Sequence, residues 1–399
     1  MKVIILTGEP FPNGMAATNR IKCYARAIKE GGVDCEVLIF RRTEVYGQKP
    51  MNIEGQGTFN DISYRFIGGT PLRGSNVLLR QINDRLDIWK TERYLNTHLT
   101  NGDVLFMFMG GYVELMLRFM KVAKRKGAFC VRDLCELPYG TGAETNKAIR
   151  LRKNTLEEQF PKLDGVISIS DSLLNLAKTY TQSTSKHIKV PIMVDFEKYY
   201  LPNKSEEVEY PYIFHSGTLY QQKDGILGMI EAFGIALRKL ETPVKFISTG
   251  NLNESPHKDE IKALIAQYNL EDNIVFTGYL SDVEMKEYLS KAEMVIINKY
   301  RTQQNNYCFS TKLGEYLAAA KPVVITRVGE AMNWLEDGKS AYVIEPEDTE
   351  ALANAIVHVF THPEESHQIG LSGQKVCRRC FDYRVWSKPL VDFLHFQKQ

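Results

Sequence analysis

The chain has 399 residues, of which 44% are hydrophobic and 25% charged, proportions typical of a soluble globular protein. This length suggests two or three domains, and the sequence has no run of about 20 apolar residues, which excludes a membrane-spanning helix. Residues 1–200 hold 29 Lys and Arg against 21 Asp and Glu, whereas residues 201–399 hold 21 against 27, so the two parts carry +8 and −6.

The first residues predict an α/β domain. Residues 2–8 form an apolar run of strand length, an amphipathic helix is expected over 18–30, and residues 35–40 predict a second strand. A strand–helix–strand opening favours a parallel sheet with both faces covered. The loop before the helix contains one glycine, Gly14, and no GxGxxG pattern, so a nicotinamide or flavin dinucleotide site is poorly supported.

A long helix is predicted over residues 76–98. It places Leu78, Ile82, Leu86 and Trp89 on one face, which favours a helix docked on the sheet. Basic residues of the same helix leave a membrane-surface role as the alternative. Further strands of this half are expected at 62–69, 103–109, 128–134, 165–170 and 187–192.

The polar stretch 196–210 predicts a domain boundary, after which the strand–helix rhythm begins again. We expect a first domain over 1–200, a second over 201–380, and a terminal helix over 381–399. Strands of the second domain are predicted at 212–218, 244–249, 274–280, 294–298, 323–326 and 341–346. Two doubly wound domains of this kind are expected to face a central cleft, where such folds bind ligands.

The stretch 305–325 suggests an anion site. Ser310 and Thr311 precede a short run of strong helix formers, and free N–H groups at a helix start favour an anion. Glu315 follows about one turn later, where a carboxylate can accept hydrogen bonds from ribose hydroxyls. Together they fit a nucleotide diphosphate, although a capped, half-buried helix explains the same residues.

Six segments, taken in order, resemble glycosyltransferase family 4. These segments are PFPNGMAATNRI (10–21), VISISDSL (166–173), VPIMVDFEKY (190–199), SGTLYQQKDG (216–225), VFTGYL (275–280) and FSTKLGEYLAAAKPVV (309–324). The resemblance implies the GT-B architecture, which has two Rossmann-like domains and a C-terminal helix, here 381–399, that crosses back and packs on the first domain. It also implies a retaining, sugar-nucleotide-dependent enzyme.

The family pattern assigns a cation pair to the segment that begins at Ser216 and Gly217. The pattern has a basic residue directly after the glycine and a lysine a few positions later, and both neutralise the donor diphosphate. Here Lys223 matches the lysine, but Thr218 stands where a basic residue is expected. Arg301 and Lys312 are candidate replacements, and Thr218 itself could donate one hydrogen bond. A solvated loop lysine is the alternative for Lys223.

The resemblance also implies the rest of the donor site. Glu315 matches a ribose-binding glutamate, and Tyr307 falls where the family usually has a glutamate that contacts the donor sugar. The implied catalytic residues are Lys223 and Glu315. The implied donor-binding residues are Gly14, Gly217, Thr218, Lys223, Gly278, Tyr279, Leu280, Tyr307, Ser310, Thr311, Lys312 and Glu315.

The acceptor side is less defined. Many relatives carry a histidine–acid pair after the strand that here reads AFCVRDL, and this chain has no histidine there. Asp133 and Glu136 remain as candidate acceptor-site acids, with solvated carboxylates in a strand-end turn as the alternative.

The resemblance implies a metal-independent, retaining hexosyltransferase-type enzyme without a cofactor. Its donor would be a nucleotide-diphosphate sugar, and its acceptor a glycan or lipid-linked saccharide in surface polysaccharide or glycolipid synthesis. A sugar-nucleotide epimerase and a non-catalytic GT-B protein that binds sugar nucleotide or supports a partner enzyme remain alternatives.

Cellular context is inferred from charge and composition. Seven cysteines and an N-terminus that resembles a strand favour the cytoplasm, with the inner face of the membrane as an open alternative. The basic cluster Lys121, Lys124, Arg125 and Lys126 suggests peripheral contact with an anionic membrane. No nucleic-acid partner is expected.

Overall fold

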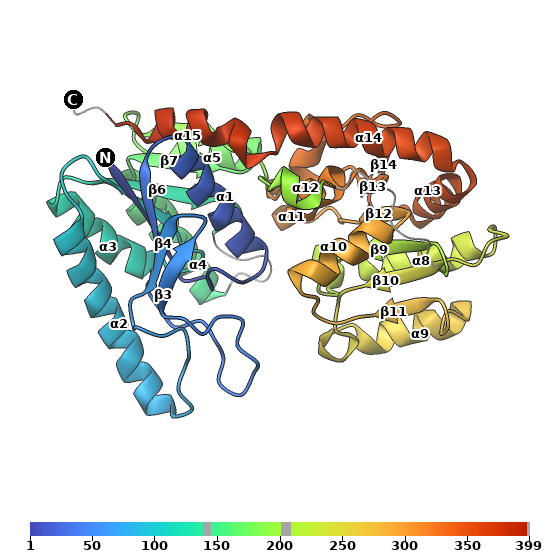
Figure 1. Ribbon diagram of the computed structural model, residues 1–399, viewed down its shortest axis with the longest axis horizontal. Helices are drawn as coiled ribbons and strands as arrows, with labels where there is room; N and C mark the ends of the chain where they lie inside the picture. The colour runs from blue at the N-terminus through green and yellow to red at the C-terminus, as the bar shows by residue number, and fades with distance from the viewer. Residues whose placement is uncertain (139–144, 201–208, 397–399) are drawn as a thin grey trace. The chain divides into compact units, whose positions relative to one another are not determined.

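The computed structural model describes residues 1–138, 145–200 and 209–396 (Figure 1). The chain divides into two compact units. Residues 1–193 together with the segment from Tyr383 onward form the first, and Val194–Asp382 form the second. The expected boundaries at 200 and 380 thus differ from this division by a few residues, and residues 201–208 lie outside the described residues.

In its described residues, the first unit contains an eight-stranded sheet in the order β3-β4-β2-β1-β5-β6-β7-β8, with only β3 antiparallel to its neighbour. Its strands are β1 (Lys2–Thr7), β2 (Asp34–Ile39), β3 (Gln56–Phe59), β4 (Ile62–Phe66), β5 (Val104–Phe108), β6 (Phe129–Leu134), β7 (Gly165–Ser168) and β8 (Lys186–Lys189). Its helices are α1 (Ala16–Glu30), α2 (Val77–His98), α3 (Val113–Arg125), α4 (Asn146–Lys153), α5 (Asp171–Tyr180) and α15 (Ser387–Leu394).

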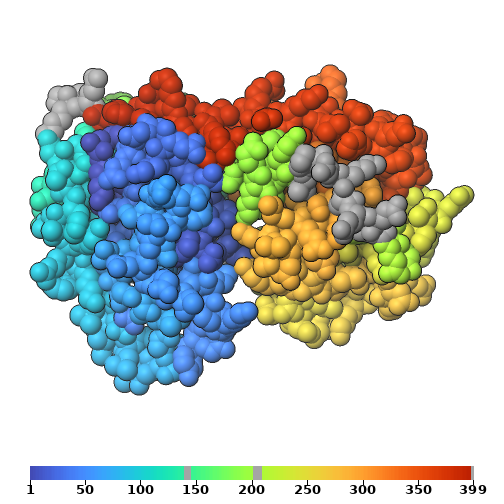
Figure 2. Space-filling model, viewed as in Figure 1, coloured from blue at the N-terminus to red at the C-terminus, as the bar shows by residue number. Residues whose placement is uncertain are grey.

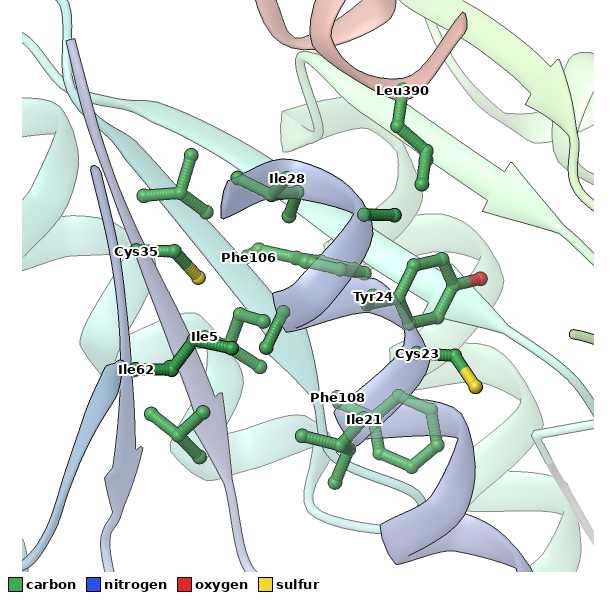
Figure 3. Packing of buried hydrophobic residues seen from close by; sticks show 14 of the residues in the cluster. Ile5, Ile21, Cys23, Tyr24, Ile28, Cys35, Ile62, Phe106, Phe108 and Leu390 are labelled. Atoms are coloured by element: carbon green, nitrogen blue, oxygen red, sulfur yellow. The ribbon is translucent and has the colours of Figure 1, made fainter. Parts of the chain in front are cut away.

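The terminal helix α15 completes the core of the first unit. Helix α1 packs one face on the sheet, through Ile21 and Ile28, and the fully buried Leu390 of α15 lies in the same cluster (Figure 3). A Cβ on Gly31 would lie 2.5 Å from Cγ2 of Val391, so only glycine lets the end of α1 approach α15 this closely. The segment from Tyr383 onward therefore belongs structurally to the first unit.

Helix α2 is oriented differently from the prediction. It packs on α3 through a face that buries Asp87, Thr91 and Leu95. The four apolar residues expected to dock on the sheet, Leu78, Ile82, Leu86 and Trp89, are instead exposed. The expectation is wrong because the apolar stripe lies on the side of the helix opposite its buried side.

In its described residues, the second unit contains a six-stranded parallel sheet in the order β11-β10-β9-β12-β13-β14. Its strands are β9 (Tyr212–His215), β10 (Lys245–Ser248), β11 (Ile274–Phe276), β12 (Met294–Ile297), β13 (Val323–Thr326) and β14 (Tyr342–Ile344). Its helices are α6 (Phe196–Tyr199), α7 (Gln221–Asp224), α8 (Ile226–Leu237), α9 (Lys258–Tyr268), α10 (Asp282–Lys291), α11 (Gln303–Tyr307), α12 (Lys312–Ala318), α13 (Thr349–Thr361) and α14 (Pro363–Cys380).

Buried apolar side chains hold the second sheet to its helices. Helix α8 is buried along most of its length and packs on α9 and α13. The cluster includes Phe233 of α8, Phe246 of β10 and Ile356 of α13, and burying such side chains stabilises a fold by about 1.5–3 kcal/mol each. Over the described part of the chain, no helix has both the length and the apolar character needed to cross a bilayer.

Candidate donor-binding site

Strand β9 is the point at which the strand order of the second unit reverses. Its neighbours are β10 on one side and β12 on the other, so connections leave it in both directions. Open parallel sheets bind ligands at the carboxyl ends of the strands beside such a point. The loop that leaves β9, residues 216–225, therefore occupies the expected position for a ligand site.

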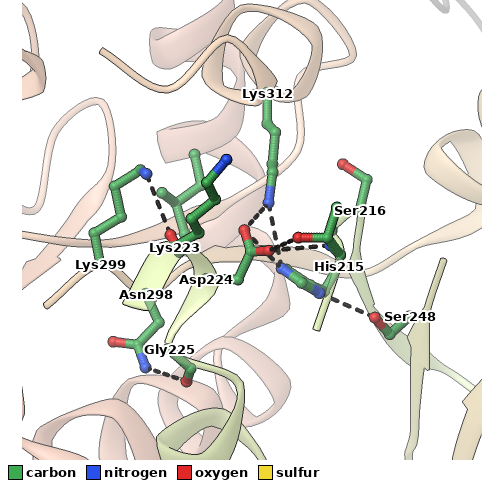
Figure 4. A network of polar contacts seen from close by, with 12 residues as sticks. His215, Ser216, Lys223, Asp224, Gly225, Ser248, Asn298, Lys299 and Lys312 are labelled. Carbon is green, nitrogen blue, oxygen red and sulfur yellow. Dashed lines mark hydrogen bonds and ion pairs between the residues drawn. The ribbon is translucent and has the colours of Figure 1, made fainter. Parts of the chain in front are cut away.

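A buried carboxylate organises this loop (Figure 4). The Asp224 side chain accepts hydrogen bonds from Thr218 N at 3.0 Å and Thr218 Oγ1 at 3.1 Å. Its other oxygen accepts a charge-assisted hydrogen bond from Lys312 Nζ at 2.5 Å. Burial by itself would raise the pKa of Asp224, but the Lys312 ammonium holds it far below its usual range. Asp224 is therefore an anion throughout the physiological pH range.

His215, the last residue of β9, lies beneath this ion pair. Its Nδ1 is 3.0 Å from Ser248 Oγ, and its Nε2 is 3.4 Å from Lys312 Nζ. Burial, and after it the Lys312 charge, lower the pKa of His215, so the ring is neutral at pH 7. Since Lys312 can only donate, Nε2 accepts and Nδ1 carries the proton. The 3.9 Å approach of His215 to Asp224 is consequently not an ion pair.

Gly217 is required by close packing. A Cβ at this position would lie 2.3 Å from Cε1 of His215 and 3.0 Å from Oδ2 of Asp224. Its N–H donates to Thr249 Oγ1 at 3.0 Å, and the N–H of Ser216 donates to the Tyr316 hydroxyl at 2.8 Å. The residue that follows β10 and a side chain of α12 thus fix the start of the loop.

Residues that follow β12 fix the other end of the loop. Three carbonyls of the loop accept hydrogen bonds from these residues. The bonds run from Asn305 to Gln222 O at 3.1 Å, from Lys299 to Lys223 O at 3.2 Å, and from Asn298 to Gly225 O at 2.9 Å. Gly225 adopts a left-handed conformation with φ of 62°, which glycine reaches without strain. The loop is therefore held on both sides by the strands that flank the switch point.

Three lysines surround the loop. Lys312 binds Asp224, and Lys299 binds the carbonyl of Lys223. The side chain of Lys223 is exposed, with no ion pair or hydrogen bond to other described residues. Of the two candidate replacements for the missing cation, Lys312 binds the same carboxylate as Thr218, whereas Arg301 pairs with Glu345 at 3.0 Å.

Helix α12 positions the predicted residues of the stretch 305–325. The N–H groups of Leu313 and Gly314 donate hydrogen bonds to the carbonyls of Ser310 and Thr311. Because two donors of the first turn are used in this way, the helix start offers less to an anion than the sequence suggests. Ser310, Thr311 and Glu315 are each half-buried.

The remaining predicted donor residues lie at three other places. Tyr307 ends α11 and is half-buried. Gly278, Tyr279 and Leu280 follow β11, two strands from β9, which is about 10 Å along the same sheet edge. Gly14 belongs to the first unit, where a Cβ would lie 2.1 Å from Oγ1 of Thr18, so packing within the loop already requires glycine there.

The two candidate acceptor acids have different environments. Asp133 is buried in the first unit, where its Oδ1 accepts from Tyr24 at 2.5 Å and from Arg20 at 3.2 Å. Solvation of this carboxylate is therefore ruled out, and its contacts give it a structural role. Glu136 is exposed. Burial raises the pKa of Glu9, Arg41 lowers it, and the charge of Glu136 raises it, so Glu9 is a nearby acid that sequence reasoning missed.

Sequence reasoning also missed His215, Asp224 and Lys299 in the second unit. A signal was present for Asp224, which directly follows Lys223 in the matched segment. His215 is the last residue of a short apolar strand, so its pattern is that of an ordinary strand end. No pattern identifies Lys299, because its role depends on where β12 lies relative to β9.

Comparison with known proteins identifies relatives of both sequence and fold. Residues 200–376 match the family model of glycosyl transferases group 1. The capsular polysaccharide biosynthesis glycosyltransferase CapM of Staphylococcus aureus is 24% identical over 234 residues, which are 55% of this chain and 58% of CapM. The matches to three other curated relatives cover 32%, 36% and 37% of those proteins, so this chain spans less than two thirds of each curated relative.

Solved structures match nearly the whole chain. The sucrose-phosphate synthase of Thermosynechococcus elongatus has a TM-score of 0.72 at 15% identity, with 98% of each chain covered. HepE of Anabaena, solved with UDP and glucose, has a TM-score of 0.69 at 15% identity, with 99% of each chain covered. At such identities the likeness concerns the fold. The chain therefore has the GT-B fold, and its residues 200–376 resemble the glycosyl transferases group 1 family.

Proposed function

We propose that the protein is a glycosyltransferase of family 4 that moves a sugar from a nucleotide-diphosphate donor to a glycan or lipid-linked saccharide. The observation that carries this proposal is the arrangement of Lys312, Asp224 and the exposed Lys223 at the switch point of the second unit. The family match and the sugar-nucleotide relatives support the same assignment.

Lys312 takes the place of the missing basic residue in this proposal. Both donors of Thr218 are directed to Asp224, so Thr218 serves the carboxylate rather than the ligand. The carboxylate in turn holds the Lys312 ammonium at the loop. Preorganised cations of this kind stabilise the negative charge that develops on a departing diphosphate.

The distances along the sheet edge fit a nucleotide. With the diphosphate at the loop after β9, the segment after β11 lies about 10 Å away, where its backbone can meet a base. Glu315 then serves the ribose, and Tyr307 contacts the donor sugar. HepE, TarM of Staphylococcus aureus and pneumococcal GtfA were each solved with UDP, which makes UDP the first nucleotide to test.

The proposed reaction retains the anomeric configuration and requires no metal ion. The bond between C1 of the sugar and the phosphate oxygen breaks as the acceptor oxygen bonds C1 on the same face. The acceptor proton passes to the departing phosphate, so no protein base is needed. Lys223 and Lys312 hold that phosphate and balance its charge. Activity that persists in EDTA, with an α-linked product from an α-linked donor, is the expected result.

Charge and relatives support this choice of acceptor. CapM is described by its role in capsular polysaccharide biosynthesis, and the first half of this chain is basic, which suits an anionic glycan or lipid-linked acceptor. Glu136 and Glu9 are candidate acceptor-site acids. An epimerase is less well supported, because His215 is buried and both its ring nitrogens have partners.

The proposal is tested by nucleotide binding and turnover. Calorimetric titration of the full chain with UDP, GDP and ADP should reveal one preferred diphosphate. Lys312→Ala should weaken its binding about 10- to 100-fold, the loss expected for a charge-assisted contact. Lys262→Ala, which removes an exposed lysine of α9, is the matched control.

Turnover decides between an enzyme and a binding protein. Release of the diphosphate from the preferred sugar nucleotide, with extracted glycan or glycolipid as acceptor, should be lost in Lys223→Ala. Binding without release, in the presence of those acceptors, would favour the non-catalytic alternative. If no diphosphate binds, or if Lys312→Ala behaves like Lys262→Ala, the proposed donor site is wrong.

A further inference from the structure

Helix α2 has an exposed apolar stripe on the first unit. Leu78 is 71% exposed and Trp89 53% exposed, and Ile82 and Leu86 between them are also exposed. With 3.6 residues per turn, these positions lie within one quadrant of the helix surface, and exposed Leu79 extends it. The stripe is continuous over more than two turns, and a single soluble domain rarely leaves such a surface without a partner.

The stripe points away from the rest of the unit. The buried residues of the helix, Asp87, Thr91 and Leu95, lie on the opposite side. In Figure 1 the helix lies along the outer edge of the first unit, and its light-blue residues form part of the surface in Figure 2. The apolar side chains are therefore exposed together.

The charges beside the stripe are positive. Arg85, Lys90 and Arg93 are exposed on the same side of the helix, and the Arg93 guanidinium lies 5.6 Å from the centre of the Trp89 ring.

The acids of the helix are neutralised elsewhere. Their ion pairs are Asp84 with Arg73 at 3.5 Å, Asp87 with Arg42 at 3.3 Å, and Glu92 with Arg118 at 3.0 Å. The outward face is consequently apolar at its centre and cationic at its margins.

We propose that α2 docks on the surface of an anionic lipid bilayer. Apolar side chains enter the boundary between headgroups and acyl chains, while Arg and Lys extend their long stems so that the charges meet lipid phosphates. A second copy of the chain is a poorer occupant, because a two-fold contact would bring Arg85, Lys90 and Arg93 close to their own equivalents. The surface goes beyond the proposed donor site and does not depend on it.

The expected basic cluster at residues 121–126 lies elsewhere. It ends α3 and leads into the amino end of β6, and Lys124 pairs with Asp164, which precedes β7, at 2.8 Å. The exposed stripe lies in the first half of α2, which follows the carboxyl end of β4. The two features therefore lie toward opposite edges of the sheet, which makes the cluster an internal control.

Vesicle co-sedimentation of the full chain tests the proposal. The probes are phosphatidylcholine vesicles with and without phosphatidylglycerol. The apolar variant combines Leu78→Ser, Ile82→Gln and Trp89→Gln, and the charge variant combines Arg85→Gln, Lys90→Gln and Arg93→Gln. The control variants are Lys121→Gln with Arg125→Gln, and Val283→Ser, which alters an exposed apolar residue of the second unit.

The wild type and both controls should sediment with the anionic vesicles. The apolar variant should bind the anionic vesicles roughly tenfold more weakly than the wild type, or weaker still. The charge variant should also bind more weakly, and its difference from the wild type should be largest at low salt, where charges are least screened. All four should keep the wild-type melting temperature, since the altered side chains are exposed. Both α2 variants should keep wild-type nucleotide binding, which separates this test from that of the donor site.

Three sedimentation results would overturn the proposal. The wild type could fail to bind anionic vesicles, both α2 variants could bind them as well as the wild type does, or the Lys121 and Arg125 control could lose binding while the α2 variants keep it. Light scattering supplies a further check. A wild-type dimer that the apolar variant converts to a monomer would assign the stripe to self-association and reject the lipid surface.

Discussion

Neutralising Asp224 should destabilise the second unit through the charge it leaves behind on Lys312. Asp224→Asn keeps the side-chain volume and an oxygen that can accept from Thr218, but it removes the partner of an ammonium 2.5 Å away. Breaking a fully buried ion pair costs about 3–5 kcal/mol. The Lys312 side chain is 24% exposed, so water compensates in part, and we expect a cost of about 2–3 kcal/mol.

The double variant isolates the pair. Lys312→Met alone should cost a similar amount, because it leaves a buried carboxylate with only its Thr218 contacts. In the variant that carries both changes neither charge remains. Its loss of unfolding free energy should therefore be about 2 kcal/mol smaller than the summed losses of the two single variants. Independent sites would add within about 0.5 kcal/mol.

Native-state hydrogen exchange read by mass spectrometry suits this measurement, because it reports the opening free energy of β9 and β10 separately from the first unit. Since the folded state lowers the pKa of Asp224, the stabilisation is complete above the unfolded value of about 3.9 and falls as pH decreases through and below it. The gap between wild type and Asp224→Asn should thus stay constant from about pH 5 to 8. Additive costs, or a gap that vanishes near neutral pH, would refute the ion pair as the organiser of the loop.

Three further changes have defined outcomes. Folding lowers the pKa of His215 below its unfolded value of about 6.5, so the unfolded state takes up a proton first as pH falls. The opening free energy of β9, measured by hydrogen exchange, should therefore decrease below about pH 6.5. His215→Gln should remove this dependence on pH. Gly217→Ala should cost about 1–3 kcal/mol by overpacking against the His215 ring and should weaken diphosphate binding in calorimetry, so unchanged values for both would contradict the packing described for the loop. Arg20→Met should destabilise the first unit by about 3–5 kcal/mol, because it leaves Asp133 buried without its cation. Adding Asp133→Asn to this variant should restore part of the lost stability in thermal unfolding. An Arg20→Met protein as stable as the wild type would exclude a structural role for the pair.

Periodicity and spacing predicted most of the fold. The strands before and after α1 follow from local patterns that the structure contains, whereas the return of the terminal helix was expected from the family resemblance. Strand β3 was not predicted, because only one of its four residues, Phe59, is apolar and the strand pairs only at the edge of the sheet. Such a segment carries no alternation to detect.

The wrong or incomplete predictions have a common physical origin, which is that contacts between distant parts of the chain leave no local pattern. A sequence shows which side of a helix is apolar but not which side meets the protein, and in α2 these sides are opposite. Likewise, Asp133 looked accessible because charged residues usually are, whereas Arg20, 113 positions earlier, buries it. Lys312 was identified only as one of two candidates, because the choice depends on a contact across 88 positions with Asp224.

The return of residues 383–396 to the first unit has a consequence for biosynthesis. Leu390 and Leu394 fill the core beside α1 only after the entire second unit has left the ribosome. The second unit is continuous in sequence and can close first, whereas the nascent first unit must wait with an open apolar groove along α1. Tyr383 then bonds Glu30, 353 positions upstream. Synthesis order therefore lets the second unit fold as soon as it is complete, whereas the first unit completes its core only when the last helix arrives.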